Sequence, residues 1–221
     1  MDQLSIALGG ISLMDFADGQ CAVSSIDFDF ESVGLALLLV DTCCDHSAYT
    51  EEYSQVARDM DAVADYLGAR VLSQVPEERF LASLEGVRTN LGDLPALRGL
   101  HYYHEMALVD ERARALQEGD AMAFLMATRR SGASSAQYLQ NVSTADRASQ
   151  PAMVALALAD RFAGPDAAVR IHGGGFGGTV QAFVPAERAD AFSAQMDAHL
   201  GPDACRRYRI TNRGAHAAWV D

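Results

Sequence analysis

The sequence predicts an α+β protein, because its hydrophobic pattern changes period twice along the 221 residues. Short alternating or wholly apolar runs near the N-terminus indicate β-strands. The middle of the chain has helical spacing, and the last part is typical of strand, helix and strand. Hydrophobic residues make up 49% of the chain, so one or two domains with a buried core are expected.

The first forty residues are expected to form one helix and three strands. Residues 1–8 have helical character and stop at Gly9 and Gly10. Asp18 and Gly19 are typical of a turn between the first two strands. The expected strands are residues 11–16, 21–28 and 35–40. The third strand is apolar throughout, which indicates that both of its faces are covered.

Four helices are predicted in the middle of the chain. The first has one apolar stripe and ends at Gly68, and the second spans residues 95–117. The stripe consists of Val56, Met60, Val63, Ala64 and Leu67. Asp120 can cap the third helix, and the fourth begins after Thr144 and should be deeply buried over residues 153–159. The apolar residues of the third helix are Met122, Leu125 and Met126.

The last part of the chain is predicted to be strand, glycine cluster, strand, helix and strand. The expected strands are residues 167–171, 179–184 and 205–210, and the expected helix is residues 186–200. The second of these strands alternates polar and apolar residues, which is a strand pattern and not a helical one.

Charge and composition exclude several classes of function. With 17 basic and 30 acidic residues, the net charge of −13 repels phosphate backbones and anionic lipid, so no nucleic-acid or membrane partner is expected. No apolar run approaches the roughly 18 residues of a membrane span, and no export leader is recognised, so a cytoplasmic protein is expected. Every basic residue is Arg. Schiff-base catalysis, a Walker loop and a protein-kinase core all need a Lys and are excluded for this chain alone.

The four cysteines are expected to be reduced thiols. Cys21, Cys43, Cys44 and Cys205 have no metal-ligand spacing, and a disulfide between the adjacent Cys43 and Cys44 would be strained. A vicinal redox pair is the alternative.

A glycine cluster follows the strand expected at residues 167–171. Residues 173–178 satisfy G-x-G-x-x-G, but a strand and not a helix is expected after them, which argues against a dinucleotide site. Two interpretations stay open. The cluster is either backbone that approaches a ligand or another loop closely, or a tight glycine-rich hairpin.

Three further polar clusters have structural interpretations. His101, His104 and Glu105 lack the spacing of a zinc-binding helix, so they are expected to pack and hydrogen-bond, and no metal site is predicted. The acidic residues between positions 41 and 52 suit the dipole at a helix start. Residues 131–135 are small, which favours close helix packing.

Four blocks in the same order resemble the galactokinases of the GHMP kinase superfamily. The blocks are Asp41 to Tyr53, with His46-Ser47 and Glu52-Tyr53; His101 to Arg112, with Glu105 and Glu111-Arg112; Ser131 to Asn141; and Arg170 to Thr179, which contains the glycine cluster. Together they span nearly the whole chain. The resemblance implies a GHMP-kinase C-terminal domain at residues 34–221, a ferredoxin-like sheet with helices, preceded at residues 1–33 by the end of the N-terminal domain.

The resemblance also implies the roles of individual residues. Met1-Asp2-Gln3 resembles the family's internal motif that bears the catalytic aspartate. Asp2 would therefore accept or orient the proton of the galactose C1 hydroxyl as it attacks the γ-phosphate of ATP, with Mg²⁺ as cofactor. Tyr53 would contact the sugar. The glycines that would support the nucleotide phosphate loop are Gly173, Gly174, Gly175, Gly177 and Gly178.

Two signatures of the resembling family do not occur in these 221 residues: the arginine-bearing sugar signature and the Gly-Leu-Ser-Ser-Ser phosphate loop. The implied reaction is phosphorylation of D-galactose to galactose 1-phosphate. The isolated chain is expected to be nearly inactive, since most of the charge stabilisation is missing. A truncated gene or a misassigned start is the favoured explanation.

Two alternatives remain open. One is a non-catalytic sugar-sensing or partner-binding module, whose exposed apolar surface would need an N-terminal half or self-association. The other is a kinase for a related sugar.

Overall fold

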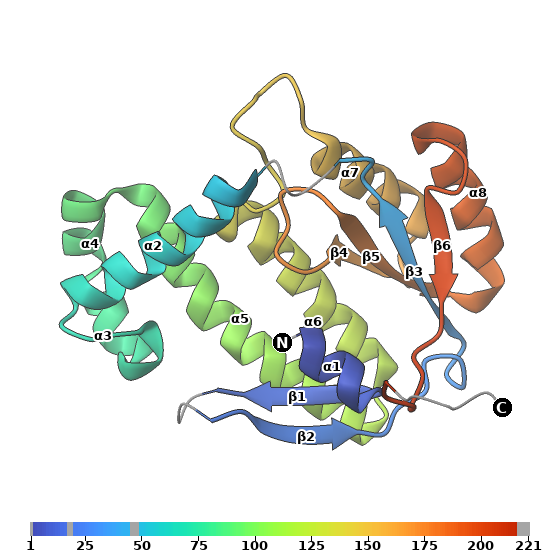
Figure 1. Ribbon diagram of the computed structural model, residues 1–221, viewed down its shortest axis with the longest axis horizontal. Coiled ribbons are helices and arrows are strands. Elements are labelled where there is room, and N and C mark those ends of the chain that lie inside the picture. The colour runs from blue at the N-terminus through green and yellow to red at the C-terminus, as the bar shows by residue number, and fades with distance from the viewer. Residues whose placement is uncertain (1, 17–19, 45–48, 216–221) are drawn as a thin grey trace, which may run out of the picture.

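The computed structural model describes residues 2–16, 20–44 and 49–215, and of Asp2 it describes only the backbone. The expected turn at Asp18 and Gly19 and the residues Asp45, His46 and Ser47 lie outside the described residues. The described elements form two antiparallel sheets, a set of long helices and a small helical lobe (Figure 1). The α+β prediction is confirmed.

The larger sheet has four antiparallel strands in the spatial order β4-β5-β3-β6. The strands are β3 (Leu35–Asp41), β4 (Ala168–Ile171), β5 (Thr179–Pro185) and β6 (Cys205–Tyr208). Helices separate β3 from β4 and β5 from β6, so the chain order is strand, helices, strand, strand, helix, strand. Together with the strand order, this is the ferredoxin-like arrangement that the resemblance implied.

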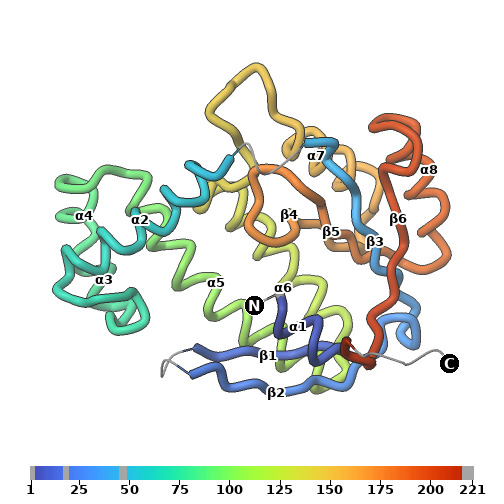
Figure 2. The backbone as a smooth tube through the Cα atoms, in the orientation of Figure 1, coloured from blue at the N-terminus to red at the C-terminus, as the bar shows by residue number. Residues whose placement is uncertain are grey.

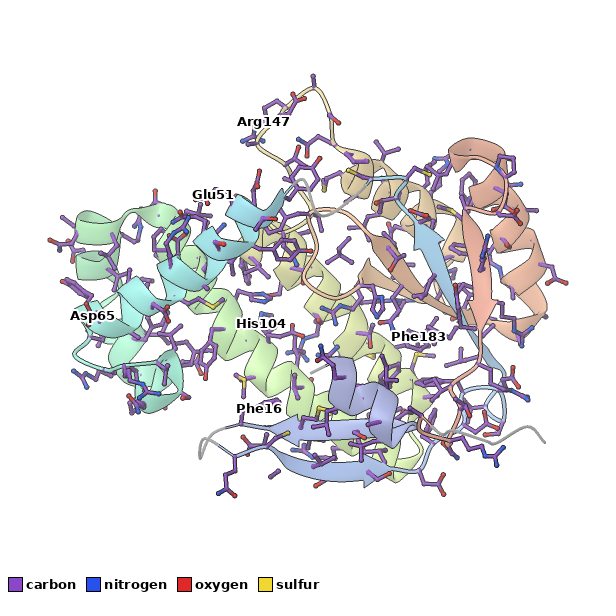
Figure 3. The ribbon with its side chains drawn as sticks, viewed as in Figure 1. Phe16, Glu51, Asp65, His104, Arg147 and Phe183 are labelled. Carbon is purple, nitrogen blue, oxygen red and sulfur yellow. The ribbon has the colours of Figure 1, made fainter. Side chains whose placement is uncertain are left out.

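The two faces of this sheet bury different residues. On one face, Leu38, Val40 and Val180 pack against α7 and α8. On the other, Phe183 meets Phe124 of α6, with ring centroids 5.0 Å apart, and Figure 3 labels Phe183 in this layer. The helices are α5 (Asp93–Glu118), α6 (Ala121–Ser134), α7 (Pro151–Ala163) and α8 (Ala189–Leu200), with a short 3-10 turn, η4 (Ala186–Arg188), before α8. The expectation that β3 is covered on both faces is confirmed.

Two helix expectations need correction. α7 begins at Pro151 and not directly after Thr144, because Thr144 and Gln150 close the intervening loop through reciprocal bonds of 3.1 Å. Its apolar run is buried on one face only, and Val154 is 52% exposed, since nothing covers the side turned away from the sheet. The third predicted helix, α6, is likewise buried on one face only, so Met122 and Met126 are exposed. Its predicted cap is confirmed, because Asp120 Oδ1 accepts a hydrogen bond from Ala123 N at 2.8 Å.

A helical lobe, formed by α2, α3 and α4, lies beside the sheet and packs on the N-terminal part of α5 (Figure 1). Its elements are α2 (Thr50–Tyr66), η2 (Leu72–Gln74), α3 (Glu77–Ala82) and α4 (Leu84–Leu91). Val63, Phe80 and Val87 are completely buried at its centre. The stripe on α2 was predicted, whereas α3 and α4 were not.

The N-terminal region, formed by α1, β1 and β2, packs on the C-terminal half of α5 (Figure 1). Its elements are α1 (Asp2–Leu8), β1 (Ile11–Asp15) and β2 (Ala22–Ile26). The two strands pair only with each other, and Ile26 is the residue that is buried against the helix. Within the described residues, no helix is long and apolar enough to cross a membrane.

Candidate active site

The glycine segment, residues 172–178, connects two neighbouring antiparallel strands. Ile171 of β4 pairs with Val180 of β5, and His172 N donates to Thr179 O at 2.9 Å. A strand therefore follows the glycines, as the sequence predicts, and a dinucleotide site of the Rossmann type is excluded. The segment is a hairpin connection, and it also approaches other parts of the chain closely.

Tyr53 lies against this segment from the first turns of α2. Its phenolic hydroxyl donates to Gly175 O at 2.6 Å, and its ring meets Phe176 edge-on with centroids 5.4 Å apart. A Cβ on Gly174 would lie 2.3 Å from the tyrosine ring, so only glycine fits there. Burial raises the pKa of Tyr53, which keeps the hydroxyl protonated and able to donate. The predicted sugar-contacting residue and the glycine cluster thus form one unit. Figure 2 shows the connection between β4 and β5 passing beside the first turns of α2.

Asn141 holds the other side of the glycine segment. Its Nδ2 donates to Gly174 O at 3.0 Å, and its carbonyl oxygen accepts from Phe176 N. Gly175 has φ +87°, and a Cβ there would lie 2.3 Å from Asn141 O. Position 175 therefore needs glycine both for its backbone conformation and for the close approach. Gly173 has φ +65° but open space around it, so only its conformation favours glycine.

A second anchor ties the end of the segment to the residues after β3. Gly178 O accepts from both Thr42 N and Thr42 Oγ1 at 2.9 Å, and Gly178 N donates to Cys44 O at 3.2 Å. The same short stretch leads from β3 toward α2. Thr42 and Cys44 therefore hold the end of the glycine segment, while Tyr53 of α2 holds its middle.

A charged and polar cluster lies beneath the glycine segment, on α5, α6 and β4. Glu105 Oε1 accepts from Arg112 Nη2 at 2.6 Å and from Ser131 Oγ at 2.8 Å. His101 Nδ1 lies 2.9 Å from Ser134 Oγ. Burial lowers the pKa of His101, which favours its neutral form. Figure 3 labels His104 on the same helix. The packing and hydrogen-bonding interpretation of these α5 residues is confirmed.

Within the described ranges, no group of three His, Cys, Asp or Glu side chains could hold a metal ion. The four cysteines are free thiols. Four of the five small residues at 131–135 are buried, as the packing interpretation expects, and Ala133 is exposed.

The structure brings together all but one of the predicted site residues. Tyr53 contacts the glycine segment directly, and Gly173 and Gly174 are exposed, so their backbone is accessible to a ligand or to another polypeptide. The side chain of Asp2 lies outside the described residues; its backbone opens α1. Sequence reasoning gave no role to Thr42 or Asn141. Asn141 ends the block from Ser131 that resembles the galactokinases, and this position was the signal that could have pointed to it.

Comparison with known proteins gives a consistent set of relatives. The chain is 31% identical over 218 residues to a galactokinase of Streptomyces lividans, covering 95% of this chain and 51% of the relative. It is 26% identical over 192 residues to a galactokinase of Glaesserella parasuis serovar 5, covering 86% of this chain and 47% of the relative. No protein-family model matches.

Two solved structures share the fold. A Lactococcus lactis galactokinase complexed with galactose matches with a TM-score of 0.73 at 16% identity, over 96% of this chain and 54% of the other. An L. major mevalonate kinase in complex with R-mevalonate matches with a TM-score of 0.61 at 18% identity, over 97% and 53%. The chain therefore spans about half the length of the curated relatives it matches.

Proposed function

Because this chain is a relative of the galactokinases and other GHMP kinases that spans about half of their length, we propose that it supplies one half of a sugar-kinase active site. The reaction would be the ATP-dependent phosphorylation of D-galactose at its C1 hydroxyl. The complementary half, in the same polypeptide or in another, would supply the sugar signature and the phosphate loop that do not occur in these 221 residues. On its own, the chain would turn over galactose negligibly.

The observation that carries this proposal is the contact between Tyr53 and the glycine segment. The family resemblance implies that Tyr53 contacts the sugar and that Gly175 supports the nucleotide phosphate loop. These residues are far apart in sequence, and in the fold Tyr53 Oη donates a 2.6 Å hydrogen bond to Gly175 O. Tyr53 is thereby held rigidly beside exposed glycine backbone, which suits a group that positions a substrate. Positioning accounts for much of the rate of phosphoryl transfer.

Asp2 would act as the base of this site. A carboxylate next to the sugar would take or orient the C1 hydroxyl proton while the oxygen attacks the γ-phosphate. Mg²⁺ and the ATP phosphates would be held mainly by the complementary half, which carries the phosphate loop. This chain would supply the base, one sugar contact and the backing of the phosphate loop.

A chimera tests the proposal. The N-terminal half of the Streptomyces lividans galactokinase is fused ahead of this chain, and formation of galactose 1-phosphate is measured with ATP and D-galactose. The chimera should be active, and Asp2→Asn should lower kcat by at least about 100-fold, the usual contribution of a positioned acid or base. Asp61→Asn, an exposed carboxylate on α2, is the matched control and should leave the rate unchanged.

Two results would contradict the proposal in different ways. A folded chimera that is inactive with galactose would refute the kinase function and leave the non-catalytic binding module as the better account. An active chimera that tolerates Asp2→Asn would keep the kinase function but remove Asp2 from the chemistry.

A further inference from the structure

Cys43 and Cys44 are adjacent thiols just after β3, and the proposed kinase reaction gives them no role. All four cysteines of the chain are free. Cys21 lies directly before β2 and is partly exposed, and Cys205 is buried in β6 at 5% exposure. Cys43 is exposed and Cys44 is partly exposed. Cys43 is therefore the most accessible of the four thiols, and a second thiol follows it in the next residue.

The sulfur atoms of this pair are held only by weak contacts. Cys43 Sγ lies 3.7 Å from Leu200 O and 3.9 Å from Asp41 O. Cys44 Sγ lies 3.4 Å from Tyr49 Oη, directly before α2. A thiol is a weak donor and a weak acceptor of hydrogen bonds. Rotation of the two side chains toward each other therefore breaks no strong interaction.

The backbone of the pair is joined to the end of the glycine segment. Asp41 pairs with Thr179, the first residue after that segment. Gly178 N donates to Cys44 O at 3.2 Å. Cys43 N donates to Asp41 Oδ1 at 2.8 Å, and Cys43 has φ +57°, a conformation that few residues other than glycine adopt. A change in the backbone of the pair is therefore transmitted to Gly178.

We propose that Cys43 and Cys44 form a site of reversible oxidation to a disulfide, with a low-molecular-weight disulfide as the oxidant. The Cys43 thiolate attacks one sulfur of the oxidant, whose S–S bond breaks and releases one thiol. The Cys44 thiolate then attacks Cys43 Sγ in the mixed disulfide and releases the second thiol. Two cysteine thiols are thereby oxidised, one oxidant molecule is reduced to two thiols, and the two cysteine protons end on those thiols.

The disulfide of adjacent residues is strained, and this strain makes the oxidation easy to reverse. Adjacent Cα atoms lie about 3.8 Å apart across a trans peptide, whereas disulfides usually join Cα atoms about 4.4–6.8 Å apart. A strained disulfide is more readily reduced than a relaxed one.

Closing the ring also constrains the backbone between the two cysteines. We expect Cys44 O to move away from Gly178 N, and Cys44 Sγ to leave Tyr49 Oη. Oxidation should therefore loosen the end of the glycine segment.

Peptide mass tests the covalent step in the full 221-residue chain. The chain has no Lys and its first Arg is Arg58, so trypsin releases residues 1–58 as one peptide. In a Cys21→Ser background, Cys43 and Cys44 are the only thiols of this peptide. The folded chain is treated with oxidised glutathione, and free thiols are then blocked with iodoacetamide. The peptide should lose the mass of two hydrogen atoms and take up no iodoacetamide, and excess reduced glutathione should restore both thiols.

Two further substitutions in the same background separate the two chemical steps. Cys44→Ser should stop the reaction at the mixed disulfide, so that the peptide keeps one glutathione on Cys43. Cys43→Ser removes the exposed nucleophile and should prevent the disulfide from forming. The Cys21→Ser chain is the matched control, because it loses a partly exposed thiol outside the pair and should be oxidised like the unmodified chain.

Amide signals test the connection to the glycine segment. In ¹⁵N spectra, the Gly178 amide should shift on oxidation and return on reduction, because its acceptor is Cys44 O. The Gly34 amide donates to Glu31 O near the opposite end of β3 and should not shift. In Cys43→Ser the oxidant should leave the Gly178 amide unchanged.

Three results would overturn the proposal. A glutathione that stays on Cys43 while Cys44 remains free would show that the ring does not close. Free thiols at both positions after treatment would show that the pair is not a site of oxidation. A closed ring without a shift of the Gly178 amide would show that the pair does not act on the glycine segment. None of these measurements involves phosphoryl transfer, so failure here is distinct from failure of the kinase chimera.

Discussion

The four-stranded sheet and the N-terminal region differ in how far their strands are buried. β3 lies at the interior of its sheet, between β5 and β6, and Leu38 is only 1% exposed. In the N-terminal region, four of the five residues of β2 are exposed, and Ile6 on α1 is 66% exposed. The large apolar side chains left exposed among the described residues up to Ile26 are Ile6, Leu8, Phe16 and Val23.

The difference indicates where the proposed complementary half would contact this chain. A two-stranded sheet is marginal in water unless it packs on a helix or gains further strands, and this one packs on α5 and on Phe124 of α6. Exposed apolar side chains on an unpaired strand edge are typical of surfaces that another polypeptide covers. In the four-stranded sheet, by contrast, helices cover the two inner strands β3 and β5 on both faces. The N-terminal region therefore is the expected contact face of the complementary kinase half.

The largest effect is expected in the core of the four-stranded sheet. Leu38→Ala should lower the free energy of unfolding by about 2–5 kcal/mol, because it leaves a cavity among fully buried side chains. Val23→Ala on β2 is the matched truncation in the N-terminal region and should cost less than about 0.5 kcal/mol. Urea unfolding of both variants measures the contrast. Equal losses would show that the two regions are equally buried and would break the comparison.

A smaller contrast is expected between two glycines with positive φ. Gly175→Ala should destabilise the chain by about 3 kcal/mol, since the new methyl group meets Asn141 O as well as an unfavourable backbone conformation. Gly34, which joins the N-terminal region to β3, has φ +75° and nothing within 4 Å of the added carbon. Gly34→Ala should therefore cost only about 1 kcal/mol. Thermal unfolding of the two variants would reveal whether the glycine segment is as tightly packed as its contacts indicate.

The smallest effect concerns the pH dependence of α5, the helix that both regions share. Burial lowers the pKa of His101 in the folded chain, so the unfolded chain binds the proton more readily. This contribution to stability is complete above the unfolded value near pH 6.5 and is lost as the pH falls below it. His101→Gln should therefore flatten the decline in unfolding free energy between about pH 7.5 and about pH 5.5. His199→Gln on the surface of α8 is the control, and an unchanged slope in His101→Gln would contradict the assignment.

Local sequence pattern was sufficient for most of the fold. The continuous apolar run of β3 and the alternation in β5 identified both strands. A strand that is covered on both faces is apolar throughout, whereas a strand with two different faces alternates polar and apolar residues. α3 and α4 are only 6 and 8 residues long and share Ser83 between them, so neither is long enough to show a helical period. The loop before α7 was missed because Thr144 and Gln150 close it through side chains, which no periodicity can reveal.

The site was predictable in its residues but not in its contacts. Tyr53 and the glycines were found through resemblance to a family, whereas Asn141 and Thr42 act through tertiary contacts with Gly175 and Gly178 that the sequence does not encode locally.

Amide hydrogen exchange tests the central contrast most directly. Exchange is compared between the 221-residue chain alone and the chimera that carries an N-terminal kinase half. The account predicts that amides of β3 and β5 are protected in both proteins, and that amides of β1 and β2 exchange rapidly in the chain alone and become protected in the chimera. Equal protection of β1 and β2 in both proteins would contradict the conclusion that a complementary half covers the N-terminal region.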